Sequence, residues 1–136
     1  METRAMFGFE EPIDSWTHLF GAIAVLVLLI RLFKKGGVGR SHPIPIIIYG
    51  FSCIFLLSMS GVYHLLPRET TARYVLRILD HAGIFLLIAG TLIAVHEILF
   101  SGLMKWSVII LAFMIAALGI TSVSYTHLTL PTNREV

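Results

Sequence analysis

The chain has 136 residues, of which 57% are hydrophobic and only 13% are charged, with a formal net charge of +2 at pH 7. Soluble domains carry about 45–50% apolar and about 25% charged residues, because their surfaces need polar groups. This composition excludes a soluble enzyme, a disordered regulator and a nucleic-acid-binding protein of the usual kind, and it indicates a polytopic membrane protein.

Four apolar runs follow a short leader, residues 1–10. They predict membrane-spanning helices over residues 13–33, 44–66, 79–100 and 105–122. A helix rises about 1.5 Å per residue, so runs of roughly 20 residues match a hydrocarbon core of roughly 30 Å. A polar connection over residues 68–77 precedes the third run. Because the backbone inside a membrane must form its own hydrogen bonds, we predict an all-α, polytopic transmembrane helix bundle over residues 11–122.

The last part of the chain, residues 123–136, changes character abruptly and is polar. It resembles translated sequencing-adapter sequence, and we expect it to be non-native. The alternative is a genuine short polar tail, which many membrane proteins have. On the first interpretation the native sequence differs after about residue 122, and the chain is the front part of a longer protein.

Three ionisable residues open the first span: Glu11, Asp14 and His18. Their spacings of three and four place them on one helix face. Ionisable groups within spans are costly, so each needs either a function or a position at the membrane boundary. For Glu11 and Asp14, a boundary position at the positive end of the helix dipole explains the residues as well as a functional site does. His18 lies one turn deeper, which favours a functional role.

A serine and a histidine lie near the end of the second span, and an aspartate opens the third. Ser60 and His64 are four apart and share a helix face. Such a histidine can bind zinc while the hydroxyl holds a carboxylate or water; the alternative is a histidine at the headgroup boundary. Asp80 is either a helix cap or a carboxylate that orients a metal-bound water. His81 projects about 100° away from Asp80 and is interpreted as interfacial.

These polar residues can meet because consecutive spans run in alternating directions. The start of the first span, the end of the second and the start of the third then lie at one membrane face. The residues that converge there are Glu11, Asp14, His18, Ser60, His64 and Asp80. The residues placed at the opposite face, and excluded from the site, are His42, His96, Glu97 and Lys105. This convergence favours one functional site over several unrelated boundary residues.

The same residues resemble the motifs of the hemolysin III family, whose relatives include the adiponectin and progestin receptors. The first motif is carried by Glu11, Asp14, Thr17, His18 and Gly21, the second by Ser60, Tyr63 and His64, and the third by Leu79, Asp80, His81 and residues 88–91. Each motif alone is weak. Three motifs in order, at one membrane face and within residues 8–120, are specific.

The resemblance implies a seven-helix bundle, of which four spans are present, with a zinc ion near one membrane face. It implies that His64 is a metal ligand and that Asp80 and Ser60 are catalytic, Asp80 holding the metal-bound water and Ser60 supporting it. Glu11, Asp14 and His18 form a supporting polar cluster. Because the superfamily includes alkaline ceramidases, the resemblance also implies zinc-dependent hydrolysis of lipid amides. The expected location is a bacterial plasma membrane with a cytoplasmic N-terminus, the expected partner is membrane lipid, and no nucleic acid is expected.

The departures from the family pattern limit this expectation. Asp14 replaces the usual Asn, and the two zinc-binding histidines of the seventh span are absent. Catalytic zinc has about three protein ligands, so this chain alone, with one imidazole, is expected to hold zinc weakly and to be inactive. Two other functions remain open: a membrane-perturbing or pore-forming protein, and a lipid-sensing receptor without turnover. The substrate and the oligomeric state also remain open.

Overall fold

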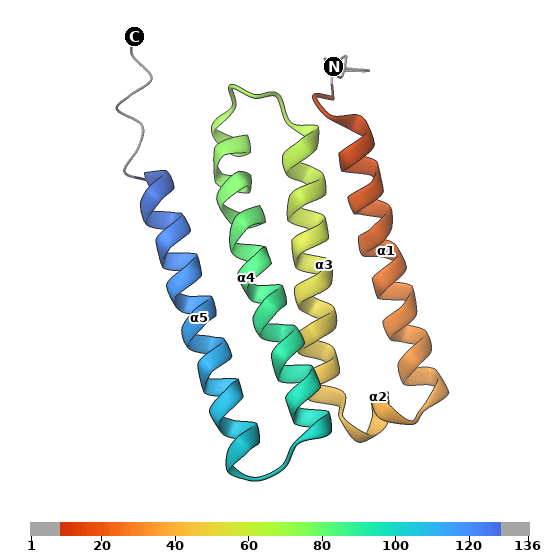
Figure 1. The fold of residues 1–136 in the computed structure, drawn as a ribbon. Coiled ribbons are helices and arrows are strands. Elements are labelled where there is room, and N and C mark those ends of the chain that lie inside the picture. The colour runs from red at the N-terminus through yellow and green to blue at the C-terminus, as the bar shows by residue number, and fades with distance from the viewer. Residues whose placement is uncertain (1–8, 129–136) are drawn as a thin grey trace.

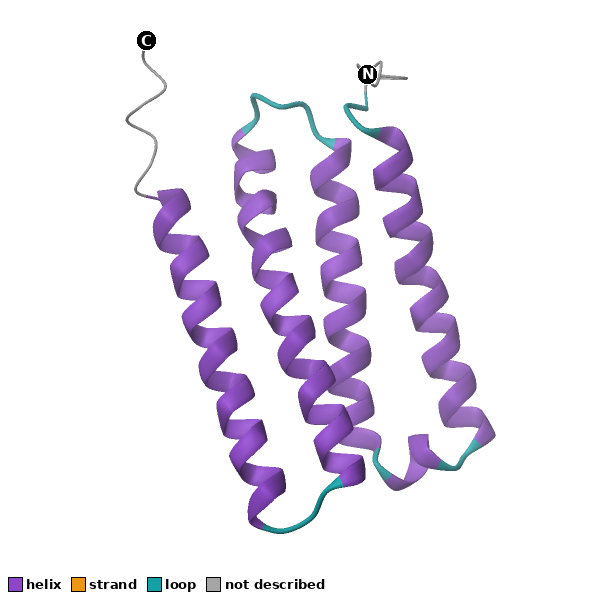
Figure 2. Cartoon of the chain, in the orientation of Figure 1, coloured by secondary structure: helices purple, strands orange, loops and turns teal. Residues whose placement is uncertain are grey.

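The computed structural model describes residues 9–128, which form helices joined by short connections (Figure 2). The helices are α1 (Pro12–Lys35), α2 (Val38–Ser41), α3 (Pro43–Leu65), α4 (Thr71–Leu99) and α5 (Leu103–Leu128). Four of these helices are long and apolar enough to cross a membrane. The predicted all-α fold with four spans is therefore confirmed, and the chain is an integral membrane protein.

The four long helices form an open antiparallel row in the chain order α1, α3, α4, α5 (Figure 1). Within the described residues, each long helix packs against its neighbours in this order, and α1 does not pack along α4 or α5. The start of α1, the end of α3 and the start of α4 all lie at one end of the row (Figure 1). The polar residues of three different spans are therefore brought to the same membrane face.

Small residues allow neighbouring helices to approach closely. Gly50 of α3 faces Leu29 of α1, and an added Cβ would come within 2.2 Å of the leucine side chain. Gly61 of α3 faces Leu19 of α1 in the same way, at 2.8 Å. The buried contact between α4 and α5 is made by Ala89, Ala112 and Ala116. Such close packing is a main source of helix association in lipid, where burying apolar surface provides little driving force.

The third spanning helix is longer than its apolar run. α4 begins at Thr71, inside the stretch that hydropathy assigns to a polar connection over residues 68–77. Thr70 caps this helix, because its Oγ1 accepts a hydrogen bond from the backbone N–H of Arg73 at 3.2 Å. A threonine cap starts a helix whatever the hydropathy of the first turns, whereas the apolar run marks only the part suited to the membrane interior. Residues 71–77 are thus helical and not a connection.

Both ends of the chain extend beyond the described residues. Residues 1–8 of the predicted leader and residues 129–136 of the predicted tail lie outside them, while residues 123–128 continue α5. The interpretation of residues 123–136 as non-native stays a prediction.

Candidate functional site

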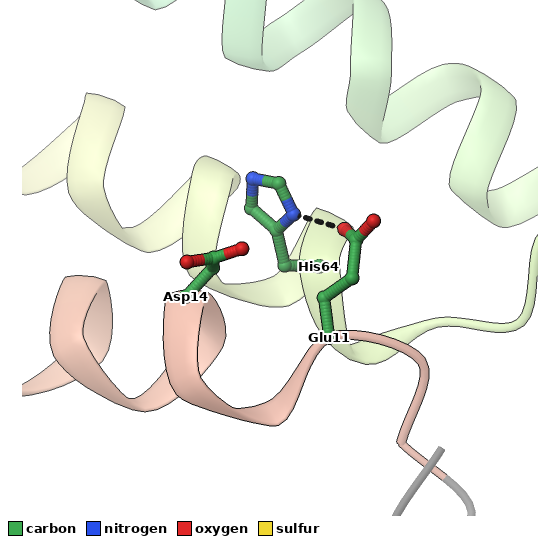
Figure 3. Close-up of side chains that lie close together, drawn as sticks. All are labelled: Glu11, Asp14 and His64. Carbon is green, nitrogen blue, oxygen red and sulfur yellow. Dashed lines mark hydrogen bonds and ion pairs between the residues drawn. The ribbon is translucent and has the colours of Figure 1, made fainter. Parts of the chain in front are cut away.

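The start of α1 is joined to the end of α3 through Glu11 and His64. Glu11 is the N-cap of α1, with proline following it at the first helical position. Its backbone N–H donates to the carbonyl oxygen of His64 at 3.1 Å, and its Oε2 accepts a hydrogen bond from the ring Nδ1 of His64 (Figure 3). The two side chains are only 23% and 21% exposed. A backbone bond and a side-chain bond therefore hold this pair in one place.

An arginine from α4 completes the surroundings of the Glu11 carboxylate. Arg73 is 7% exposed, and its Nη2 lies 3.3 Å from Oε2 of Glu11. Its Nη1 donates to the carbonyl oxygen of Leu66, and its guanidinium carbon lies 4.7 Å from the centre of the Tyr63 ring. These contacts link the first three spanning helices at the membrane face.

The carboxylate of Glu11 is held in its ionised form. The hydrogen bond from His64 is the largest cause that lowers the pKa of Glu11 from its ordinary value of 4.5, and burial of the carboxyl opposes it. The charges of His64, Arg73 and Arg68 lower this pKa further. Because an ionised carboxylate only accepts hydrogen bonds, Nδ1 of His64 carries the proton of the shared bond. The other ring nitrogen is then available to a cation when the imidazole is neutral.

A second polar pair lies one turn deeper. His18 Nδ1 lies 2.9 Å from Ser60 Oγ, and Ser60 is buried. The ring of His18 stands edge-on to the ring of His64, with 5.7 Å between their centres. The buried Ser15 hydroxyl donates to the Gly61 carbonyl oxygen at 2.7 Å and locks the two helices beside this pair. Two histidines on different helices thus face one another at the candidate site.

Three of the predicted residues could hold a metal ion together. Glu11, Asp14 and His64 each offer one ligand atom, and these atoms lie within 4.8 Å of one another. Figure 3 shows the Asp14 carboxylate beside the His64 ring, and the second ring nitrogen directed away from Glu11. One nitrogen and two carboxylate oxygens are ligand types that zinc accepts, so the donor set fits a zinc ion. Asp14 is exposed at the rim of this group.

Asp80 makes no direct contact with the other ionisable residues of the predicted site in the described part of the chain. It is half-buried on α4, and within residues 9–128 no hydrogen bond or ion pair joins its carboxylate to Glu11, His18 or His64. It also lies outside the group of possible metal ligands in this part of the chain. His81 directs Nδ1 to the carbonyl oxygen of Arg77 at 2.7 Å, within its own helix. Direct contacts therefore join the predicted residues of the first two spans, and Asp80 takes part in none of these contacts.

Sequence reasoning missed Arg73 as a functional residue. Arg73 lies within residues 68–77, which hydropathy assigns to a polar connection, because the apolar run begins after it. The signal that could have identified it is Thr70, a capping residue three positions earlier, which predicts an earlier helix start. With the helix extended, Arg73 lies on α4 at the level where Glu11 and His64 meet.

Comparison with known proteins gives a consistent result. The Haemolysin-III related family matches residues 8–135 of the chain. Hemolysin-3 from Bacillus cereus is 31% identical over 124 residues, which cover 88% of this chain and 55% of the relative. Membrane progestin receptor beta from Sus scrofa is 30% identical over 77 residues, covering 54% of this chain and 22% of the receptor. The mouse (Mus musculus) receptor of the same name is 28% identical over 87 residues, covering 62% and 25%.

The chain covers only part of the length of these relatives. It spans about half the length of the Bacillus cereus relative and about a quarter of each receptor. No solved structure shows a significant match to it.

Proposed function

We propose that this chain, which belongs to the haemolysin-III related family, carries part of the site of a zinc-dependent membrane hydrolase of lipid amides. The observation that supports this most directly is the bond between His64 and Glu11 at the membrane face, with Asp14 beside it. The activity belongs to the complete protein, since the chain spans about half of its Bacillus cereus relative.

The geometry of His64 matches the way in which proteins present metal-binding histidines. Such a histidine usually donates its other ring N–H to a carboxylate, which fixes the orientation of the ring. Glu11 accepts this bond from His64. His64 would hold the zinc ion through its other ring nitrogen, with an oxygen ligand from Asp14, while Glu11 would orient the imidazole ring. When bound, zinc lowers the pKa of water towards 7 and polarises a carbonyl group, which is the chemistry that amide hydrolysis needs.

The remaining residues would orient the reactants. Ser60 is held by His18 at 2.9 Å, so its hydroxyl is kept in a defined place one turn before His64. Asp80, at the same membrane face on α4, would accept a proton from the attacking water. The family resemblance supports both roles.

The proposal is tested by zinc analysis and amide hydrolysis of the complete protein in lipid nanodiscs. We expect about one zinc per protein and release of fatty acid from a ceramide-like amide, both lost in His64→Gln. His81→Gln is the matched control, because it removes an imidazole that lies outside the metal-ligand group of the described residues. Hydrolysis that persists in His64→Gln, or a complete protein without stoichiometric zinc, would contradict the proposal.

A second candidate function is ligand binding without turnover. The observation that favours it is the similarity to the two membrane progestin receptors. The two functions are separated by recovering the bound lipid: an intact ligand after prolonged incubation supports a receptor, and a cleaved one supports the hydrolase. The name of the Bacillus cereus relative points to a third, lytic function. Liposome leakage that is unchanged by His64→Ala would favour that function.

A further inference from the structure

A cavity of about 970 Å³ opens beside the candidate site, where α3, the α3–α4 connection and the start of α4 meet the Glu11 carboxylate. Glu11 and Tyr63 belong to both places, since both line the cavity and both contact the His64 ring. The α3–α4 connection and the helix ends that line the cavity lie at one end of the row (Figure 1), which is the level of the lipid headgroups.

The charged groups that line the cavity are three arginines, Arg68, Arg73 and Arg77, and two glutamates, Glu11 and Glu69. Glu11 is engaged by His64 and Arg73. Arg77 is exposed, and within residues 9–128 it forms no ion pair. The lining therefore carries an excess of positive charge. Arg77 can bind a ligand without first breaking an ion pair.

The other two arginines differ in how firmly they are held. Arg68 is 67% exposed and pairs with Glu10 at 2.7 Å, an exchangeable contact because exposed ion pairs contribute little free energy. Arg73 is buried and stacked on Tyr63, and two of its five N–H donors serve Leu66 and Glu11. A guanidinium that is already ordered loses little conformational freedom when an anion accepts hydrogen bonds from its remaining N–H groups.

We propose that this cavity binds the phosphate group of an anionic membrane lipid. Arginine is the side chain best suited to phosphate, because its planar donors match the phosphate oxygens. Basic pockets between spanning helices are a known kind of headgroup site, and tyrosines favour this depth of the membrane. Arg77 and Arg68 contact the phosphate from the exposed side of the cavity, and Arg73 contacts it from the buried side. The inference stands apart from the proposed hydrolase, since it requires neither metal nor turnover.

The test measures lipid binding to the chain in a neutral detergent by native mass spectrometry. Three probes are titrated: dioctanoyl phosphatidylglycerol, dioctanoyl phosphatidylcholine and inorganic phosphate. The expected result is preferential binding of phosphatidylglycerol, weakened about fivefold in Arg77→Gln, since one arginine near a membrane surface contributes about 1 kcal/mol. Arg77 is exposed, so this variant should fold, and its helical content is checked by circular dichroism.

The matched control is Arg40→Gln. Arg40 is an exposed arginine of α2, at the opposite end of the row, and its replacement makes the same change in net charge. Arg40→Gln should bind phosphatidylglycerol as tightly as the unaltered chain does. Equal weakening by both variants would mean that only net charge attracts the lipid, and equal binding of phosphatidylcholine would mean that headgroup charge is not recognised. Inorganic phosphate that binds as tightly as the lipid would identify a free-anion site. Any of these three results overturns the proposal.

Discussion

Glu11 and His64 are 53 positions apart in sequence, yet they are bonded through both backbone and side chains. The backbone bond brings the first residue before α1 to the last turn of α3, and the side-chain bond joins a carboxylate to an imidazole. Neither bond depends on a metal. The pair is thus a structural connection between two spanning helices as well as the centre of the candidate site.

Replacing Glu11 by Gln should weaken the docking of α1 on α3. The variant keeps the size of the side chain but removes the charge that accepts bonds from His64 and Arg73. We expect a loss of roughly 1 kcal/mol in the free energy of unfolding, the size of one charged hydrogen bond discounted for partial exposure. Unfolding in mixed detergent micelles measures it. Glu10→Gln is the control. Glu10 pairs with the exposed Arg68, so this substitution should change the free energy of unfolding little.

The stability of the same junction should depend on pH. The pKa of Glu11 is lowered in the folded chain, chiefly by the bond from His64, so the unfolded chain binds more protons in the window below the ordinary value of 4.5. The stabilising contribution is therefore present above about pH 4.5 and is lost as the pH falls through the lower, folded pKa. Thermal unfolding as a function of pH measures this dependence. The pH dependence contributed by Glu11 should disappear in Glu11→Gln. An unchanged pH profile in that variant would refute the role assigned to Glu11.

His18 and Ser60 should be energetically coupled. Removing either side chain of a hydrogen-bonded pair between membrane helices costs little, and coupling energies average about 0.6 kcal/mol. We expect a coupling of about this size from a double-mutant cycle of His18→Ala and Ser60→Ala. Thr17 donates to carbonyl oxygens of its own helix, so a cycle of Thr17→Ala and Ser60→Ala should be additive. Additivity in the first cycle would show that the 2.9 Å contact carries no energy.

Gly61→Ala should separate α1 from α3. An added Cβ would come within 2.8 Å of the Leu19 side chain and 3.2 Å of the Ser15 carbonyl oxygen, which is part of a helix backbone and cannot move alone. Overpacking of this kind costs about 1–3 kcal/mol, which exceeds the gain in helix propensity of up to about 1 kcal/mol. Gly21→Ala is the control, because its added Cβ would meet Leu57 at an ordinary 3.4 Å. Comparable stability of the two variants would contradict this account of the interface.

Metal binding should distinguish the residues of the candidate site. Cobalt(II), which reports its ligands through visible absorption, should bind the chain with an affinity reduced at least tenfold in His64→Gln, the effect expected for losing a ligand or its close partner. Asp80→Asn should leave this affinity unchanged, because Asp80 lies outside the ligand group. In the complete protein, Asp80→Asn should retain zinc but lose hydrolysis. Loss of metal in Asp80→Asn would show that Asp80 is a ligand.

Some of these contacts could not be predicted from the sequence. Alternating span directions predict that Glu11 and His64 lie at one membrane face. They do not predict which side chains at that face bond to one another. That choice depends on how far each helix is rotated and how closely it approaches its neighbour. At the α1–α3 interface, Gly61 leaves room for the close approach of Leu19. Asp80 illustrates the same limit, because it shares the predicted face but does not belong to the ligand group of Glu11, Asp14 and His64 in the described residues.

The membrane location, the all-α class and the presence of four spans could be predicted from the sequence, because the length and hydropathy of an apolar run are local properties of the chain. Tertiary structure alone decided that Arg73, outside every apolar run, would be buried against Glu11 and Tyr63, and that a cavity would open beside them. A charge is buried only where partners neutralise it, and the partners of Arg73 lie on other helices, distant in sequence.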